Sequence, residues 1–180
     1  MNGFERRKQK KTEQIFAAAC SLLQKYGYSK VSVNEIAAAA HVSPATVFNY
    51  FGTKEQMFAE MLEDWMDKQL AKYEEILESS LAYPEKLKAV MLAEAGQLKF
   101  LLEDLRDVQH LLGNRSEEKL RQFFMKLIAK GRTEGYIPME FADELVQRYL
   151  NMYLREFRQG VDPSQAEPML RLFFYGLSNT

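Results

Sequence analysis

The stretch over residues 31–58 constrains the fold of this chain most, because its caps and breaks define two very short helices followed by a third. Ser32 and Glu35 have the spacing of a capping box, and an alanine-rich run follows them. Ser43 is the next N-cap, and Pro44 occupies the first helical position, where proline is tolerated. The pattern predicts two short helices, over residues 35–40 and 44–51.

A longer helix is predicted to follow the second short one. Gly52 can end the preceding helix in a left-handed conformation, and Thr53 with Gln56 forms a second capping box. The helix then runs from Lys54 to Ser79, about 39 Å at 1.5 Å per residue. Before this stretch, an apolar stripe at helical spacing predicts a bracing helix over residues 10–25, so the first 53 residues form a three-helix head.

The 44–51 helix is too short to be stable alone in water, because the free-energy cost of helix nucleation is offset only when about 12–15 residues are helical. Val47 and Phe51 lie one turn apart and can pack on the preceding helix, which leaves small, amide and phenol side chains outward. A short helix held in this way is typical of a helix-turn-helix DNA reader. The alternative is an ordinary helical hairpin. The outward residues are Ala45, Thr46, Asn49 and Tyr50.

This stretch resembles the DNA-binding module of the TetR family of bacterial transcriptional regulators. Two positions depart from the family pattern: His41 replaces a glycine in the turn, and Phe48 replaces a common tyrosine. Histidine is enriched at positive φ, so the turn can form. Phe48 lacks the hydroxyl with which relatives can reach a phosphate. The matching residues are Val33, Ile36, Ala37, Ala40, Val42, Ser43, Thr46, Val47, Tyr50, Phe51, Lys54, Glu55 and Phe58.

Five residues of the head are the predicted DNA contacts. Asn49 can pair bidentately with adenine, and Tyr50 and Lys54 are expected to meet phosphates. Ser43 and Thr46 complete the set. Residues 1–60 carry eight Lys and Arg against five Asp and Glu, a modest basic bias that suits DNA. The basic run over residues 6–11 is either a frayed, solvated end or an arm that reaches the DNA.

The rest of the chain, residues 54–180, is predicted to form a helical body, so the fold class is all-α. Helices are expected at about 85–112, 117–134, 140–158 and 163–178, and no hairpin signal interrupts them. Pro168 is expected to kink or restart the last helix. Only this body is expected to hold a ligand or a subunit interface.

The last two helices carry more apolar surface than one packed face requires. Apolar side chains cover roughly 220° of the 140–158 helix, whereas a helix packed on one side needs only about 100°. The excess predicts a homodimer interface, and the resemblance implies the same, a four-helix bundle made by the last two helices of each subunit. A deeply buried monomer core is the alternative. The predicted interface residues are Tyr149, Tyr153, Leu170 and Phe174.

The resemblance also implies a small-molecule effector in the body. Trp65 and Tyr73 lie about two turns apart on the long helix, and Met61 lies one turn before Trp65. Phe100 and Phe123 are expected to close the other walls. These five residues predict a largely apolar ligand with one polar end.

The sequence carries no recognisable catalytic, metal or cofactor site. Its two histidines and single cysteine have no metal-ligand spacing, and no glycine-rich loop has phosphate-binding spacing. Cys20 is expected to be a small buried residue, and a redox sensor is the alternative. No apolar run is long enough to span a membrane, so a cytoplasmic protein is expected.

These observations predict a homodimeric transcriptional regulator that binds a palindromic operator in double-stranded DNA. We expect the protein to act as a repressor that a small, hydrophobic effector releases from its operator. An effector-independent DNA-binding or architectural dimer is the alternative, and an all-helical enzyme is a more distant one. The sequence gives neither the operator nor the effector.

Overall fold

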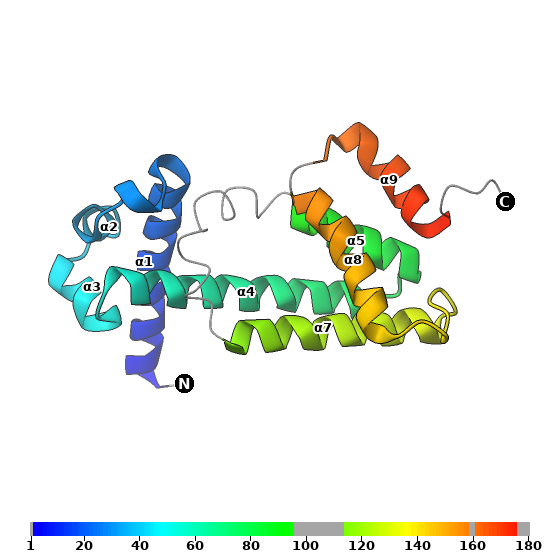
Figure 1. The fold of residues 1–180 in the computed structure, drawn as a ribbon. Helices are drawn as coiled ribbons and strands as arrows, with labels where there is room; N and C mark the ends of the chain where they lie inside the picture. The colour runs from blue at the N-terminus through cyan, green and yellow to red at the C-terminus, as the bar shows by residue number, and fades with distance from the viewer. Residues whose placement is uncertain (1, 96–113, 159–160, 176–180) are drawn as a thin grey trace. The chain divides into compact units, whose positions relative to one another are not determined.

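A computed structural model describes residues 2–95, 114–158 and 161–175 of the chain, and this described part is helical, with no strand. The all-α prediction is confirmed. In order, the elements in Figure 1 are α1 (Gly3–Tyr26), the 3-10 turn η1 (Tyr28–Lys30), α2 (Val33–Ala39), α3 (Pro44–Phe51), α4 (Lys54–Glu78), α5 (Tyr83–Ala95), α7 (Asn114–Thr133), α8 (Asp143–Arg158) and α9 (Pro163–Tyr175).

The described residues form two compact units, a head that ends at Met66 and a body that begins at Asp67. The change of unit therefore falls within α4. Met57 and Phe58, near the start of α4, are completely buried and belong to the head. The predicted division between residues 53 and 54 marks where the turn ends, whereas packing assigns the first half of α4 to the head.

Helix α1 begins at Gly3, seven residues before the predicted start at residue 10. Asn2 is its N-cap and accepts hydrogen bonds from the backbone N–H groups of Phe4 and Glu5, at 3.0 and 2.9 Å. The Glu5 carboxylate accepts a hydrogen bond from the Asn2 N–H at 2.8 Å, which completes a capping box. The helix packs on the head through its other end, where Ile15, Phe16, Ala19 and Leu23 are buried.

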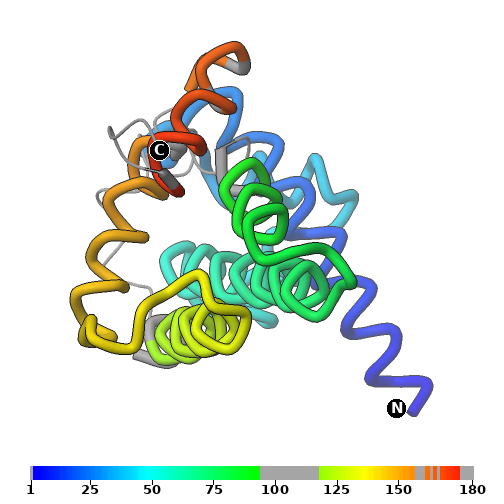
Figure 2. Tube along the Cα trace, turned by 90° about the vertical axis from the view of Figure 1, so that its right-hand side faces the viewer, coloured from blue at the N-terminus to red at the C-terminus, as the bar shows by residue number. Residues whose placement is uncertain are grey.

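In the body, the second half of α4 lies beside α7, as Figures 1 and 2 both show. Lys119 pairs with Asp67 and Lys126 with Glu74, so two ion pairs join these helices along their exposed edges. Between them, the rings of Tyr73 and Phe123 lie 5.7 Å apart in the body core. The core is completed by apolar side chains of α5 and α8.

Helix α8 contributes one stripe to this core and leaves a second stripe exposed. Val146, Leu150 and Leu154 recur at four-residue spacing and are 8%, 1% and 2% exposed. A helix buried on one side needs no more apolar surface than this. The further apolar residues Leu145, Tyr149 and Met152 remain exposed in the single chain. Pro168 lies inside α9, where the structure continues the helix past it.

Candidate nucleic-acid interface and body cavity

The turn between α2 and α3 is held by backbone hydrogen bonds on both sides. Ala40 ends α2 by donating its N–H to Ile36 O at 2.8 Å, and Val42 N–H donates to Ala37 O at 2.9 Å. His41 between them has φ 52°, the left-handed conformation expected of a residue that replaces glycine here. The side chain of Gln14 donates to Ala40 O at 2.7 Å, which fixes the turn against α1.

Helix α3 starts as predicted, with Ser43 as its N-cap and Pro44 in its first turn. Ser43 Oγ accepts a hydrogen bond from Thr46 N–H at 3.1 Å and lies 2.9 Å from Thr46 Oγ1. Both hydroxyls therefore already have a partner within the cap. Any contact that they make with DNA has to use their remaining lone pairs or protons.

One side of α3 is fixed to the head and the other is open. Val47 and Phe51 are buried, and the Phe51 ring lies 5.4 Å from that of Phe16 in α1. This contact supplies the support that so short a helix needs. The opposite side presents Asn49 and Phe48 as exposed side chains. Of the remaining predicted contacts, Thr46 and Tyr50 are half-buried, whereas Ser43 is exposed.

Lys54 opens α4 in a more enclosed position than a free surface lysine. Its ammonium donates a hydrogen bond to Tyr28 O at 2.7 Å and lies 4.2 Å from the centre of the Tyr28 ring. Partial burial lowers the pKa of the Lys54 ammonium. Two of its three N–H groups are left for a phosphate. The capping box of Thr53 with Gln56, at 3.1 Å in both directions, holds this helix start.

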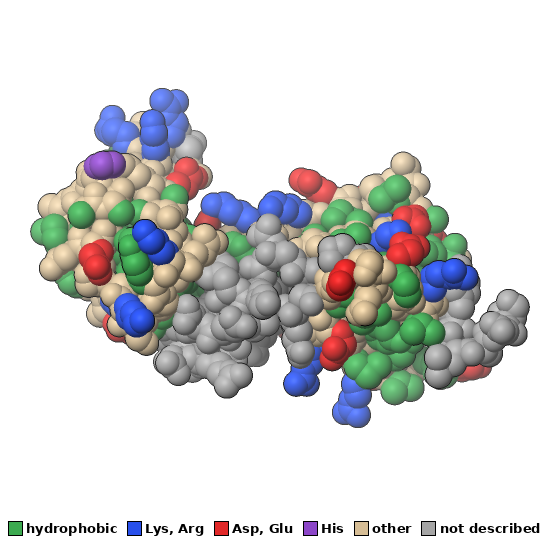
Figure 3. All heavy atoms as spheres, turned by 90° about the horizontal axis from the view of Figure 1, so that it is seen from above, with side chains coloured by type: hydrophobic (Ala, Val, Ile, Leu, Met, Phe, Trp, Pro, Cys, Tyr) green, Lys and Arg blue, Asp and Glu red, His purple; other side chains and the backbone are tan. Residues whose placement is uncertain are grey.

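Basic side chains gather on one side of the head, at the upper left in Figure 3. Arg6, Arg7, Lys8 and Lys10 are exposed and lie in the first turns of α1. The run that the sequence left open as either a frayed end or an arm is therefore helical. Its exposed charge is available to attract a polyanion.

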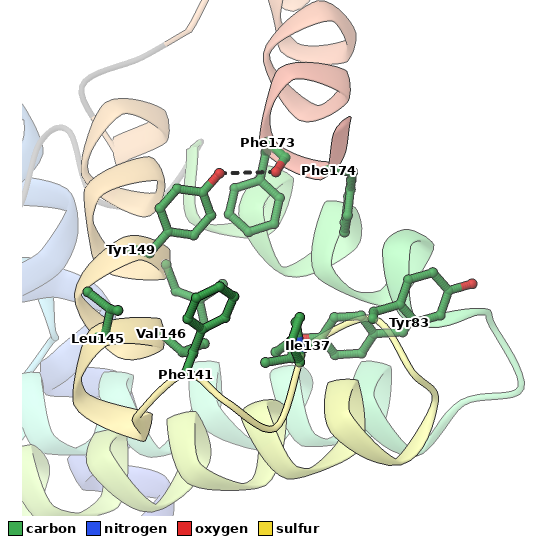
Figure 4. Close-up of a pocket in the computed structure, with 11 residues that line it drawn as sticks. Tyr83, Ile137, Phe141, Leu145, Val146, Tyr149, Phe173 and Phe174 are labelled. Carbon is green, nitrogen blue, oxygen red and sulfur yellow. Dashed lines mark hydrogen bonds between the residues drawn. The ribbon is translucent and has the colours of Figure 1, made fainter. Parts of the chain in front are cut away.

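The body contains a cavity of about 440 Å³ between α8, α9 and the segment that joins α7 to α8. In Figure 4, Phe141 points into the space below Tyr149 and Phe173, and Ile137 and Tyr83 lie on its other side. The lining is largely aromatic and aliphatic, as in most small-molecule sites. It consists of Tyr83, Tyr136, Ile137, Pro138, Phe141, Leu145, Val146, Tyr149, Leu150, Phe173 and Phe174.

Three tyrosines contribute to the cavity wall, namely Tyr83, Tyr136 and Tyr149. Tyr149 donates a hydrogen bond to Phe173 O at 3.1 Å, and burial raises the pKa of Tyr149 to about 12. The hydroxyl of Tyr83 is buried and has no hydrogen-bond partner among the residues that the structure describes. Tyr83 also lies so close to α7 that a Cβ on Gly131 would come within 2.6 Å of its ring. Burial raises the pKa of Tyr83 as well, so both phenols stay neutral.

The four predicted ligand residues that the structure describes do not line this cavity. Met61 and Trp65 belong to the head, buried and half-buried respectively. Tyr73 and Phe123 pack together in the body core, and Phe100 lies outside the described residues. Four of the eleven lining residues come from the segment 136–141, which the sequence did not single out as a ligand site. Its signal was an unusual density of large apolar residues in a segment between two helices.

The predicted interface residues lie together on α8 and α9. The ring of Phe173 stacks on that of Tyr149 at 5.0 Å and meets Tyr153 edge-on at 4.7 Å. Leu170 is buried in the body core, and Phe174 is half-buried in the cavity wall. Of the four predicted residues, Tyr149 is exposed (41%). Neighbouring residues of both helices add further exposed apolar surface, namely Leu145 (55% exposed), Met152 (54%) and Leu172 (43%).

No group of three or more potential metal ligands occurs among the residues that the structure describes. Within the same residues, no helix is both long and apolar enough to cross a membrane. Cys20 is half-buried rather than fully buried, and burial raises the pKa of its thiol. A redox sensor requires a lowered thiol pKa. The structure therefore gives no support to the sensor alternative.

Comparison with known proteins identifies the head. Residues 15–61, which run from the second half of α1 to the first turns of α4, match the bacterial regulatory proteins of the tetR family. A curated relative, the HTH-type transcriptional repressor KstR2 of Mycolicibacterium smegmatis, is 23% identical over 150 residues, which cover 77% of this chain and 73% of that protein.

Solved structures extend the likeness over nearly the whole chain. The fatty acid degradation regulator FadR from Bacillus halodurans has a TM-score of 0.77 at 23% identity, covering 94% of this chain and 97% of that one. FadR from Bacillus subtilis in complex with stearoyl-CoA has a TM-score of 0.76 at 20% identity, covering 92% and 99%. The head therefore carries the DNA-binding module of the tetR family of bacterial regulatory proteins, and the whole chain shares the fold of these solved regulators.

Proposed function

We propose that this protein is a homodimeric transcriptional repressor that binds a palindromic operator in double-stranded DNA and is released by a small apolar effector. The observation that carries the proposal is the presentation of α3. Val47 and Phe51 fix the helix to the head, and its opposite side, which includes Asn49, is open. The KstR2 relative is named as a repressor, and none of the relatives compared above is an enzyme. We therefore propose no catalytic activity.

The exposed stripe of α8 supports the homodimer. Leu145, Tyr149 and Met152 recur at spacings of four and three residues, so they form one edge of the helix beside the edge that is already buried. Leu172 of α9 adds exposed apolar surface. A second copy of the chain would cover this surface in a symmetric contact. Two heads in such a dimer would need to sit about 34 Å apart to read successive turns of one DNA face.

The aromatic cavity supports an effector site between α8 and α9. Its volume of about 440 Å³ falls in the range of small-molecule pockets. The lining is apolar apart from its tyrosines, which favours a largely apolar ligand. The FadR relative from Bacillus subtilis binds stearoyl-CoA, so acyl compounds are the first candidates for this chain. The sequence-based ligand site around Trp65 remains a second candidate.

DNA binding is tested by selecting bound duplexes from a random library with the purified full-length protein. An enriched inverted repeat is expected, and Asn49→Ala should relax the base preference at one position of each half-site. Leu92→Ala, on the exposed side of α5, is a matched control that should leave the preference unchanged. If no sequence is enriched, or if Asn49→Ala selects the same repeat with the same stringency, the assignment of α3 is wrong.

The effector is tested on the selected operator. Stearoyl-CoA and tetraphenylphosphonium represent acyl compounds and lipophilic cations, and one of them is expected to release the DNA. Phe141→Ala removes a half-exposed cavity wall and should weaken the active compound about fivefold, the equivalent of roughly 1 kcal/mol of lost apolar contact. Release that Phe141→Ala leaves unchanged would favour the site around Trp65. No release by either compound would favour the effector-independent alternative.

A further inference from the structure

The outward side of α3 has an apolar edge and no charge. The helix consists of Pro44–Phe51 and contains no Asp, Glu, Lys or Arg, although these types make up 27% of the chain. Pro44, Ala45 and Phe48 are all exposed, and the Phe48 side chain is 49% exposed. Such an edge offers nothing to a phosphate, because it has neither a cation nor a hydroxyl.

Helical geometry places these three residues next to one another. Pro44 and Ala45 precede Phe48 by four and three positions, which is the spacing of neighbours on a helix surface. Asn49 adjoins them on the side away from the buried Val47. The α3 surface therefore presents an apolar edge with an amide beside it.

Other residues of α3 make the ring contacts that hold the helix, and about half of the Phe48 side chain stays exposed. Phe51, one turn later, makes the aromatic contact with α1, and the ring of Tyr50 packs beside that of Phe51 at 6.0 Å. A single exposed apolar residue is common on any protein surface. Its place on the open, uncharged side of a helix that the proposed function puts in the major groove is what suggests a function.

In the major groove, the apolar group that a base presents is the C5-methyl of thymine, and phenylalanine and alanine are among the side chains that contact it. We propose that Phe48, flanked by Ala45, reads the methyl group of one thymine in each half of the operator. Asn49 beside it suits adenine, so the α3 face selects A·T base pairs. This inference rests on the proposed function, because it requires that α3 enter the major groove.

The test replaces single thymines by deoxyuridine in the operator selected by the wild-type protein. Deoxyuridine removes only the methyl group and keeps every hydrogen-bonding group of the base. Burying one methyl changes a dissociation constant about fourfold. At one thymine of each half-site, replacement should therefore weaken binding about fourfold, and replacement in both half-sites should weaken it about fifteenfold. Other thymines should tolerate the change.

The protein side of the test uses Phe48→Ala. This variant should bind the thymine and deoxyuridine operators equally, because the group that senses the methyl is gone. Phe48→Tyr keeps the ring and should keep the discrimination. Met139→Ala, at a residue of the body that is 75% exposed, is the matched control and should behave as wild type. Circular dichroism checks that each variant is folded, and the deoxyuridine scan of the wild-type protein needs no variant at all.

The outcomes separate this inference from the proposed function. If the wild-type protein selects an operator but tolerates deoxyuridine at every thymine, the phenyl ring contacts sugar or nothing, and the inference is wrong. The same conclusion follows if folded Phe48→Ala still discriminates against deoxyuridine. If no operator is selected, the proposed function fails and this inference fails with it.

Discussion

Replacing Met152 tests whether the exposed stripe of α8 faces a second subunit. Its side chain is 54% exposed in the single chain, whereas Leu150 and Leu154 on the buried side of the same helix are 1% and 2% exposed. Met152 does not line the cavity, so its replacement does not alter the proposed effector site directly. The perturbation is Met152→Ala, which shortens the side chain without adding charge.

The expected effect follows from the exposed fraction. Full burial of a methionine side chain is worth about 1.5–3 kcal/mol, so covering the exposed half at an interface is worth roughly 0.8–1.6 kcal/mol. A symmetric dimer contains the residue twice, which gives roughly 1.6–3.2 kcal/mol. The dimer dissociation constant should therefore rise roughly 15- to 200-fold. The stability of the single chain should change by less than about 0.5 kcal/mol, as for other surface substitutions.

Sedimentation velocity over a dilution series measures the dissociation constant, and urea unfolding of the monomer measures stability. Leu92→Ala is the matched control, because Leu92 is 45% exposed on α5 of the same unit. It should leave dimerisation unchanged. An unaltered dissociation constant for Met152→Ala, or an equal effect of Leu92→Ala, would refute the assignment of the interface to this stripe.

Three further predictions concern the head. Lys54→Ala should weaken binding to all DNA sequences alike and lower the slope of log affinity against log salt by about one, and Lys54→Met, which keeps the apolar stem, should do the same. Ser32→Ala and Ser43→Ala should each lower the free energy of unfolding by about 1 kcal/mol, since both residues cap helices, but only Ser43→Ala should also weaken operator binding. Because burial raises the pKa of Cys20, its thiolate is scarce below that pKa, and iodoacetamide at pH 8 should modify it more slowly in the native protein than in urea.

The head was predictable from the sequence because short-range chemistry determines its boundaries. Ser32 and Ser43 cap the two short helices as expected, and Gly52 with φ 78° ends the second of them. Each signal involves residues three or four positions apart, so one sequence is enough to recognise it. The positive φ of His41 was instead expected from the resemblance, because the family pattern has glycine at this position of the turn.

The start of α1 was predicted seven residues late for a local reason as well. The basic run was left open as either a frayed end or an arm, but Asn2 and Glu5 have the spacing of a capping box. Lysine, arginine, glutamine and glutamate are also good helix formers. The capping box and these helix propensities together extend α1 through the charged run, and both can be recognised in the sequence.

The cavity could not be located from spacing along one helix. Trp65 and Tyr73 share a face of α4, but a shared face does not distinguish a closed core from an open site. Tyr73 meets Phe123 across the core, where side chains fill the space. The cavity instead depends on how residues 136–141 approach α8 and α9, which is a long-range property of the fold. The close approach of Gly131 to Tyr83 is another contact of this kind.

Tyr149 connects the proposed effector site with the proposed subunit interface. Its ring lines the cavity and stacks on Phe173, yet the residue is 41% exposed on the same edge of α8 as Met152. An effector that holds this ring in place would favour association of the subunits, and one that displaces it would oppose association. Linkage makes the effect reciprocal, so dimerisation must change effector affinity by a matching factor. An effector that saturates the cavity but leaves the dimer dissociation constant unchanged would show that Tyr149 serves only one of the two sites.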